Sequence, residues 1–530
     1  MTLKARQTVG VPSEYATKWM MSMDDVATVP LSPARKAVVM TLIMITTIMV
    51  ILDTTIANVA LPHMQAALGA TPDTISWVLT SYILASAVAT PMTGWLAGRL
   101  GRKGLFGAAV IGFTASSALC GVSATLPMMV FARVLQGVFG AFIMPLTQAF
   151  LYDMNNKAEQ VRAITIWGMG VMLAPIAGPI LGGYLTESYN WRWVFFINVP
   201  IGIAAAFGIM SLMPHFPSFR RGFDKAGFLI LLVTLAALQL LLDRGTQEDW
   251  FNSPEILIEA GLSVGGFWVL INHLRNSPNA ILPAGLFRDR NFVVSLLLVF
   301  MVGAIMTAGS TLLAPMLQSL FNYPVFTAGV LVGPRGLGML MSMMCVGRLI
   351  RLVDTRVVIL VGMALTAGSL WMMTSFSLNM GQNLILWSGL VQGIGMGLVS
   401  MPMNLMSVST LSTSLRTEGA ALYSLCRSVG GSVAIAITSA LLAHNLQINH
   451  AEIGAALRLP FLTSGLVEGL GAQSAILLAY ANAEVTRQAM MIAYINDYWL
   501  MMWVTILLMP MVLLMRTVRP DKGEPIHVSE

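Results

Sequence analysis

Long apolar runs separated by short polar segments fill the sequence from about residue 37 to residue 515. A helix needs about 20 mostly apolar residues to cross the hydrocarbon core of a bilayer. Fourteen runs meet this requirement, which predicts an all-α polytopic membrane protein. The seventh and eighth runs are the weakest because a short acidic segment separates them. The runs cover residues 37–62, 75–97, 104–123, 126–151, 162–186, 193–213, 226–242, 255–274, 292–318, 325–347, 356–377, 383–410, 418–444 and 491–515.

Positive charge alternates between the predicted loops. With the N-terminus placed inside, 23 of the 30 Lys and Arg residues fall in inside loops or termini, four fall in outside loops and three lie within runs. Because cytoplasmic loops are enriched in Lys and Arg, this split predicts an even number of crossings and two cytoplasmic termini. Twelve crossings fit the alternation as well as fourteen, whereas thirteen would break it.

The composition excludes several other classes. The 530 residues are 56% hydrophobic and 10% charged, whereas about 25% of a soluble domain is charged. The formal charge is +6, but the basic residues lie between the apolar runs and form no patch interleaved with aromatic residues. We therefore expect no nucleic-acid partner. The three cysteines all lie inside apolar runs, which argues against a disulfide framework or a spaced metal site. The first 33 residues or so lack the apolar core of a signal peptide.

Short sequence echoes relate the early runs to the late ones. Ala60-Leu61-Pro62 near the end of run 1 resembles Ala314-Pro315 in run 9, and Met144-Pro145 in run 4 resembles Met401-Pro402 in run 12. Two related halves around a central site are typical of transporters. We therefore expect a cytoplasmic extension (1–36), an N-terminal six-helix half (37–213), two linker helices (214–291), a C-terminal six-helix half (292–516) with an outer segment at about 445–490, and a cytoplasmic tail (517–530).

Asp53 is an acid within the first apolar run. A carboxylate in hydrocarbon costs several kcal/mol, so such a residue usually faces a protein-lined or aqueous interior and serves a function. Arg133 in run 4 lies at a similar depth, since both residues are roughly 10–13 Å from the outer ends of their helices at 1.5 Å per residue. This depth favours a pair that couples proton movement to transport, and the alternative is a static polar contact.

Five stretches resemble motifs of the 14-helix drug:proton antiporters of the major facilitator superfamily, with the EmrB-like branch the best match. They are the helix-1 signature (Leu52–Pro62), the loop motif after helix 2 (Gly94–Lys103), the helix-4 motif (Arg133–Gly137), the helix-5 antiporter motif (Ala174–Tyr184) and the segment after it (Trp191–Gly202). The resemblance covers about residues 37–516 and implies the major facilitator fold, two six-helix halves plus two extra central helices. Gly98 stands where the loop motif usually has Asp, which predicts a weakened acid-based latch. Ala174 stands where the helix-5 motif often has Gly.

The matched motifs also suggest site residues. A cytoplasmic gate is expected at Gly94, Arg99, Gly101, Arg102 and Lys103, and antiport and sealing are linked to Gly178, Pro179, Gly182 and Gly183. Asn58, Gln136, Arg335 and Arg427 are assigned to the substrate cavity. Counting Asp53 as the embedded acid against the bases Arg133, Arg335 and Arg427 favours anionic or neutral amphiphiles over dications. In the alternative interpretation, Arg335 and Arg427 cap backbone carbonyls or pair across the two halves.

No Walker-type phosphate loop, zinc spacing or nucleophile motif occurs in the sequence, so we expect no enzyme activity and no cofactor. The leading interpretation is proton-driven export of drugs or toxic amphiphiles across the bacterial inner membrane by alternating access. A dedicated exporter of one metabolite and a non-transporting membrane sensor are the alternatives. The resemblance adds a periplasmic adaptor and an outer-membrane channel as partners; the long outer segment is either a contact for them or a passive loop.

Overall fold

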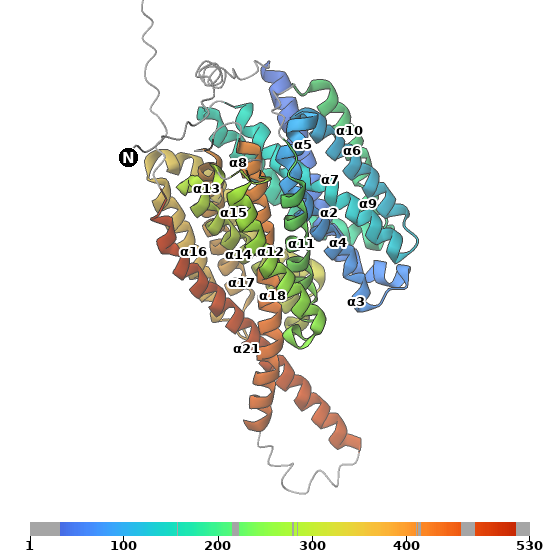
Figure 1. The fold of residues 1–530 in the computed structure, drawn as a ribbon. Helices are drawn as coiled ribbons and strands as arrows, with labels where there is room; N and C mark the ends of the chain where they lie inside the picture. Colours follow the sequence, from blue (N-terminus) through green and yellow to red (C-terminus); the bar gives the residue numbers. More distant parts are fainter. Residues whose placement is uncertain are drawn as a thin grey trace, which may run out of the picture.

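The computed structural model describes residues 32–155, 157–214, 222–277, 280–283, 285–409, 411, 415–456 and 472–515. Within these residues the regular structure is entirely helical (Figure 1). The first half holds α2 (Pro33–Leu68), α3 (Pro72–Ile75), α4 (Trp77–Ala89), η1 (Thr90–Met92), α5 (Thr93–Leu100), α6 (Arg102–Val122), α7 (Leu126–Asp153), α8 (Lys157–Ser188), α9 (Trp193–Phe196) and α10 (Asn198–Leu212). The linker holds α11 (Lys225–Arg244), η2 (Trp250–Asn252), α12 (Pro254–Asn276) and α13 (Gly285–Arg288). The second half holds α14 (Arg290–Phe321), α15 (Val325–Leu352), α16 (Thr355–Thr374), α17 (Gln382–Ser409), α18 (Arg416–Ala456) and α21 (Ala472–Val512).

The helices match the predicted apolar runs. Twelve helical stretches of the described chain are long and apolar enough to cross a membrane. The two other predicted runs are also helical: α4, η1 and α5 follow one another over 75–97, and the 32-residue α8 contains 162–186. The fold is therefore consistent with fourteen crossings.

Several helices run further than their apolar cores. α2 continues past Pro62 to Leu68, and α14 continues past Pro315 to Phe321, so the prolines of the two echoes lie inside helices rather than at their ends. A proline removes one backbone donor, a local loss that the remaining hydrogen bonds and neighbouring helices tolerate in a membrane protein. Polar caps then fix the ends: Ser32 accepts a bond from the Arg35 N–H, and Gly69 closes α2 with a φ of 62°.

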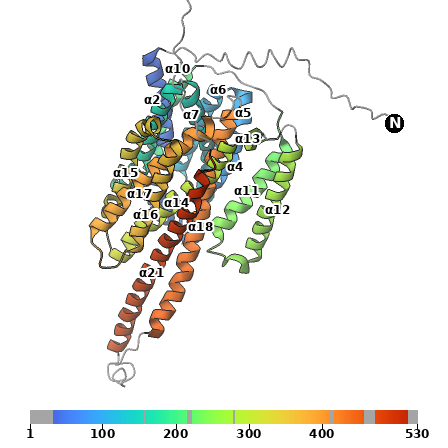
Figure 2. The same cartoon turned by 90° about the vertical axis from the view of Figure 1, so that its left-hand side faces the viewer.

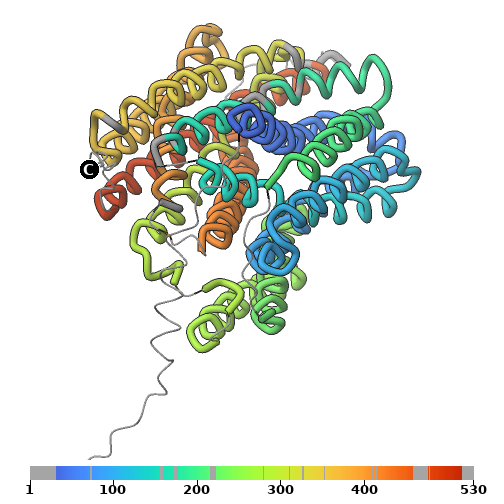
Figure 3. Tube along the Cα trace, turned by 90° about the horizontal axis from the view of Figure 1, so that it is seen from above, coloured from blue at the N-terminus to red at the C-terminus, as the bar shows by residue number. Residues whose placement is uncertain are grey.

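The two halves meet at the end of the bundle that carries the predicted cytoplasmic loops. A buried apolar cluster joins Tyr152 of α7 and Trp167 of α8 to Met339 and Met343 of α15. The Tyr152 hydroxyl also donates to the backbone oxygen of Asn404 in α17, at 2.8 Å. The linker pair α11 and α12 packs against both halves, through α4 and through α18, and stands at the edge of the bundle in Figure 2. Figure 3, seen along the bundle, separates the N-terminal helices from the C-terminal ones.

α18 and α21 form an antiparallel hairpin that extends well beyond the other helices (Figures 1 and 2). Each is 41 residues long, and they are tied by Asn449 Nδ2 to the Ala489 oxygen at 3.3 Å and by His450 to Asn482 at 3.0 Å. The predicted outer segment is thus helical on both flanks, and its residues 457–471 lie outside the described chain. The first and last described residues lie at the opposite end of the bundle from the hairpin (Figure 1). The rest of the expected N-terminal extension and the tail 517–530 also lie outside the described residues.

Candidate functional site

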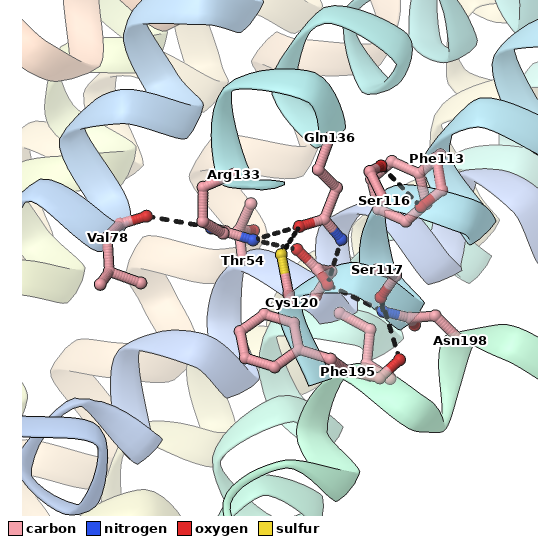
Figure 4. A network of polar contacts seen from close by, with 12 residues as sticks. Thr54, Val78, Phe113, Ser116, Ser117, Cys120, Arg133, Gln136, Phe195 and Asn198 are labelled. Atoms are coloured by element: carbon pink, nitrogen blue, oxygen red, sulfur yellow. Dashed lines mark hydrogen bonds and ion pairs between the residues drawn. The ribbon is translucent and has the colours of Figure 1, made fainter. Parts of the chain in front are cut away.

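Asp53 lies at the centre of a polar network in the first half. Figure 4 shows this network from close by, with Arg133, Gln136 and Asn198 labelled. Its Oδ2 accepts from Arg133 Nη1 at 2.7 Å. Its Oδ1 accepts from Gln136 Nε2 and from Asn198 Nδ2, both at 2.8 Å. All four side chains are fully buried. The proximity of Asp53 and Arg133 expected from their depth is therefore observed, and three side-chain donors surround the carboxyl group of Asp53.

Arg133 is enclosed by groups that suit a cation. Its Nε donates to the backbone oxygen of Val78 at 2.9 Å, and its Nη1 also donates to Gln136 at 2.8 Å. The guanidinium carbon lies 4.4 Å from the ring centroid of Tyr82 and 5.8 Å from that of Phe195. A buried ion pair is strong only when its remaining groups are satisfied, and these contacts supply that satisfaction for all but Nη2.

The helix spacing explains how the network assembles. Arg133 and Gln136 are three residues apart on α7 and therefore share one face of that helix. Asn198 stands at the start of α10, where Ser117 of α6 lies 3.0 Å from its amide. The network around Asp53 thus connects five helical segments of the first half: α2, α4, α6, α7 and α10.

Glycines of α8 lie against the stretch of α2 that carries Asp53. A Cβ at Gly178 would lie 2.7 Å from the Thr55 Cβ, and a Cβ at Gly182 would lie 3.1 Å from the Ile56 Cγ2, whereas Gly183 has open space. Small residues at such positions let two membrane helices approach closely. Pro179 is part of the same helix, but its side chain lies outside the described residues. The predicted antiporter stretch thus contacts α2 next to the buried acid.

A second ionic cluster joins the halves at the predicted cytoplasmic end. Asp153, the last residue of α7, pairs with Arg102 of α6 and, at 3.5 Å, with Arg416 of α18. Arg102 follows Gly101, whose φ of 75° lies in the region that favours glycine.

The other predicted gate residues take different places. A Cβ at Gly94 would lie 2.7 Å from the Cδ of Glu418 on α18, so this glycine permits close contact between the halves. The Arg99 guanidinium lies 5.7 Å from the Trp95 ring centroid. Lys103 is half-buried at the start of α6.

The residues assigned to a substrate cavity do not form one group. Gln136 belongs to the Asp53 network and is fully buried, and its assignment to a substrate cavity stays a prediction. Asn58 is exposed on α2. Arg335 donates to the backbone oxygen of Met306 at 3.0 Å, as expected in the alternative interpretation that this arginine caps a backbone carbonyl. Arg427 is half-buried and lies one helical turn from Tyr423.

The structure reveals residues that the sequence argument missed. Asp497 of α21 is fully buried, and Glu259 of α12 is also buried, so the count of one embedded acid against three bases is wrong. Asp497 could have been found in the same way as Asp53, because it is also an acid inside an apolar run. Asn198 could have been found as the polar residue within the apolar stretch Phe195–Val199, and Asp153 as the acid ending run 4. Among the described residues no cluster of three His, Cys, Asp or Glu side chains could hold a metal ion.

The comparison with known families decides the classification. The family model described as Major Facilitator Superfamily matches residues 43–435. The multidrug export protein EmrB of Escherichia coli strain K12 is 30% identical over 491 residues, covering 91% of this chain and 96% of that protein. This chain belongs to the EmrB-like drug exporter family of the major facilitator superfamily. It is therefore a multi-pass inner-membrane protein of a transporter family.

Two further similarities complete the comparison. The fatty acid resistance protein FarB of Neisseria gonorrhoeae is 32% identical over 79% of this chain and 83% of that protein. The crystal structure of the human organic anion transporter MFSD10 matches with a TM-score of 0.57 at 13% identity, covering 90% of this chain and all of that one. The latter similarity supports the fold alone.

Proposed function

We propose that this protein exports small amphiphiles in exchange for protons, with Asp53 as the proton-coupling acid. The observation that carries the proposal is the fully buried ion pair of Asp53 with Arg133, closed by Gln136 and Asn198. Protonation of Asp53 would remove the charge that holds these donors and free α2, α7 and α10 to shift. Proton binding would thus be converted into helix movement.

The contact between the halves supports alternating access. In this conformation the predicted cytoplasmic end is closed by the cluster around Trp167 and Met343 and by the ion pairs of Asp153. Arg102 and Arg416 come from opposite halves and share this one carboxylate. Opening toward the cytoplasm requires Arg416 to leave Asp153, which makes the cluster a cytoplasmic gate in the proposed cycle.

The charge of the second half favours anionic or neutral amphiphiles as substrates. Arg335 and Arg427 lie in helices α15 and α18 of that half, and their charges exceed the acids of the same region even when Asp497 is counted. The name of the related FarB refers to fatty acid resistance, which is in keeping with an anionic amphiphile. A panel of fatty acids, neutral drugs and quaternary dications tests this preference. Stronger export of dications than of fatty acids would refute it.

Export can be measured in everted vesicles from a host that lacks its own efflux pumps. We expect wild-type vesicles to accumulate substrate when acidified inside and Asp53→Asn vesicles to lose that accumulation. The variant Glu187→Gln, which changes an exposed acid at the end of α8, serves as the matched control. Full activity in Asp53→Asn would remove Asp53 from the coupling role.

The α18–α21 hairpin is the proposed docking site for a periplasmic adaptor of a tripartite pump. It projects beyond the bundle and exposes Ile448, Ile476, Leu478 and Tyr480, between 41% and 74% of each side chain. Apolar side chains on a projecting helix pair are typical of a protein contact. Ile476→Asp with Tyr480→Asp should lower resistance in intact cells and leave transport by the purified protein in vesicles unchanged. Equal losses in both assays, or in neither, would contradict docking.

A further inference from the structure

Asp497 is a buried acid of the C-terminal half with surroundings opposite to those of Asp53. Its carboxyl group is fully buried on the inner face of α21. Neither Oδ1 nor Oδ2 has a hydrogen-bond partner on the described residues. The Asp53 carboxylate, by comparison, accepts three hydrogen bonds and pairs with an arginine.

Within the described residues, the elements packed against α21 bring no cation into contact with the Asp497 carboxyl oxygens. α21 contacts α14, α16 and α18. From α14, Met316 lies 3.9 Å from the Tyr498 hydroxyl and Ser319 faces Tyr494. Next to α16, the Phe376 ring lies edge-on to Tyr498 with centroids 5.9 Å apart.

The charged groups nearby act on the tyrosines instead. Arg335 of α15 acts electrostatically on Tyr498, and among the described residues no cation acts on Asp497 itself. His444 of α18 is exposed. The ionisable groups that interact electrostatically with Asp497 are therefore the phenols of Tyr494 and Tyr498, which are ordinarily uncharged.

A carboxylate in this position would be an isolated charge without a partner. Such a charge costs several kcal/mol in a protein interior, so a buried acid of this kind takes up a proton instead. Ionisable residues inside membrane segments commonly serve proton transfer. The step is simple: the carboxylate takes a proton from hydronium to become a carboxylic acid plus water, and returns it when the site is hydrated.

We propose that Asp497 is a second proton-binding site, located in the C-terminal half and occupied in this conformation. It differs from Asp53, whose carboxyl oxygens accept three hydrogen bonds in the same conformation. The proposal rests on the proposed antiport for its role in transport, but its protonation stands on the geometry alone. With both acids exchanging protons, one cycle moves one more proton than Asp53 alone would carry.

The first experiment measures protonation without transport. Infrared spectra of the purified full chain in detergent at neutral pH should show the carbonyl band of a buried carboxylic acid. Asp497→Asn should lower the intensity of that band, and the control Glu187→Gln should leave it unchanged. Because Asn has the shape of the neutral acid, the variant should also keep the thermal stability of the wild type. A spectrum without the band, or a band of unchanged intensity in Asp497→Asn, would overturn the proposal.

The second experiment counts protons. At steady state, each coupled proton changes the substrate gradient about tenfold per pH unit across the membrane. In reconstituted vesicles the steady-state substrate gradient is measured against the pH difference across the membrane. For each pH unit, this gradient should rise by a factor about ten times smaller in Asp497→Asn than in the wild type. An unchanged slope would mean that Asp497 keeps its proton throughout the cycle and would overturn its role as a carrier. Absence of any pH-driven gradient in the wild type would refute the antiport itself, while the infrared result would still stand.

Discussion

Asn198 donates from its side-chain amide to the Asp53 carboxylate at 2.8 Å, across 145 residues of sequence. This bond ties the first residue of α10 to the centre of α2. It makes α10 part of the polar network around Asp53, together with the arginine and glutamine of α7. The network is therefore a junction of helices as well as an ion pair.

The Asn198 bond can be tested by substitution. Asn198→Ala should lower export several-fold because the carboxylate loses one of three donors and α10 loses its tie to α2. Ser117→Ala removes only the hydroxyl 3.0 Å from the Asn198 amide and should have a smaller effect. Vesicle transport rates measure both. A larger loss in Ser117→Ala than in Asn198→Ala would contradict this order.

Breaking the buried ion pair should cost stability as well as activity. Asp53→Asn leaves the fully buried Arg133 without its counter-charge, a change that costs about 3–5 kcal/mol in proteins. The double variant with Arg133→Gln should recover much of the lost thermal stability in detergent and still fail to export. Recovery of export in the double variant would show that the pair is structural.

The glycines of α8 provide a matched pair of substitutions. Gly178→Ala should destabilise the protein by about 1–3 kcal/mol because the new methyl group meets Thr55 of α2. Gly183→Ala adds the same methyl group five residues further along, in open space, and should be neutral. Thermal unfolding in detergent and vesicle export should both separate the two variants. Equal behaviour would mean that close approach of α8 to α2 is unimportant.

Loosening the Asp153 cluster should open the predicted cytoplasmic end. In a background without native cysteines, a cysteine replacing the buried Met343 reports on that end by its reaction with a soluble thiol reagent. Arg416→Gln should raise the labelling rate several-fold, since it breaks the link between the halves and leaves Arg102 with Asp153. Glu159→Gln, which affects the exposed pair with Lys36 inside one half, should not. Similar rates in both variants would argue against a gate at Asp153.

The linker pair should respond to acid through Asp224. Burial alone would raise the pKa of this carboxyl, but bonds from the Gly227 N–H, the His273 ring and the Ile281 N–H hold its pKa below the ordinary value. A lowered folded-state pKa stabilises the protein above the unfolded pKa of about 4, and the gain disappears as the pH falls through the folded value. The stability difference between wild type and Asp224→Asn should therefore be constant near neutral pH and shrink below about pH 4. Asp249→Asn, in an exposed turn, should show no such change.

The apolar runs were enough to predict the helices, because crossing a bilayer imposes a minimum length on each apolar segment. The predicted ends of the first and ninth helices were wrong because Pro62 and Pro315 lie inside α2 and α14. The other helical hydrogen bonds and the neighbouring helices compensate for the one backbone donor that each proline lacks. The extension of α18 and α21 beyond the bundle was also hidden, because polar side chains there read as an outer segment.

The candidate site was only partly predictable. Depth within the runs put Asp53 and Arg133 at one level, but depth carries no information about which faces of two helices meet. Gln136 therefore seemed free for substrate, although its spacing from Arg133 puts it beside Asp53. Asp497 has no surrounding motif, and its lack of a partner is a property of the packed helices that no sequence pattern records.

α18 runs unbroken for 41 residues from Arg416 at the gate to the hairpin, a stiff rod of roughly 60 Å at 1.5 Å per residue. A tilt of about ten degrees, about a pivot one third of the way along α18, would move the Arg416 end by roughly 3 Å and the far tip by roughly 7 Å on that length. Parting Arg416 from Asp153 by such a tilt would therefore be amplified outside the membrane. An adaptor bound to the tip of the hairpin would be displaced in each transport cycle. Movement of α18, in addition to binding affinity, would then couple transport to the state of the adaptor.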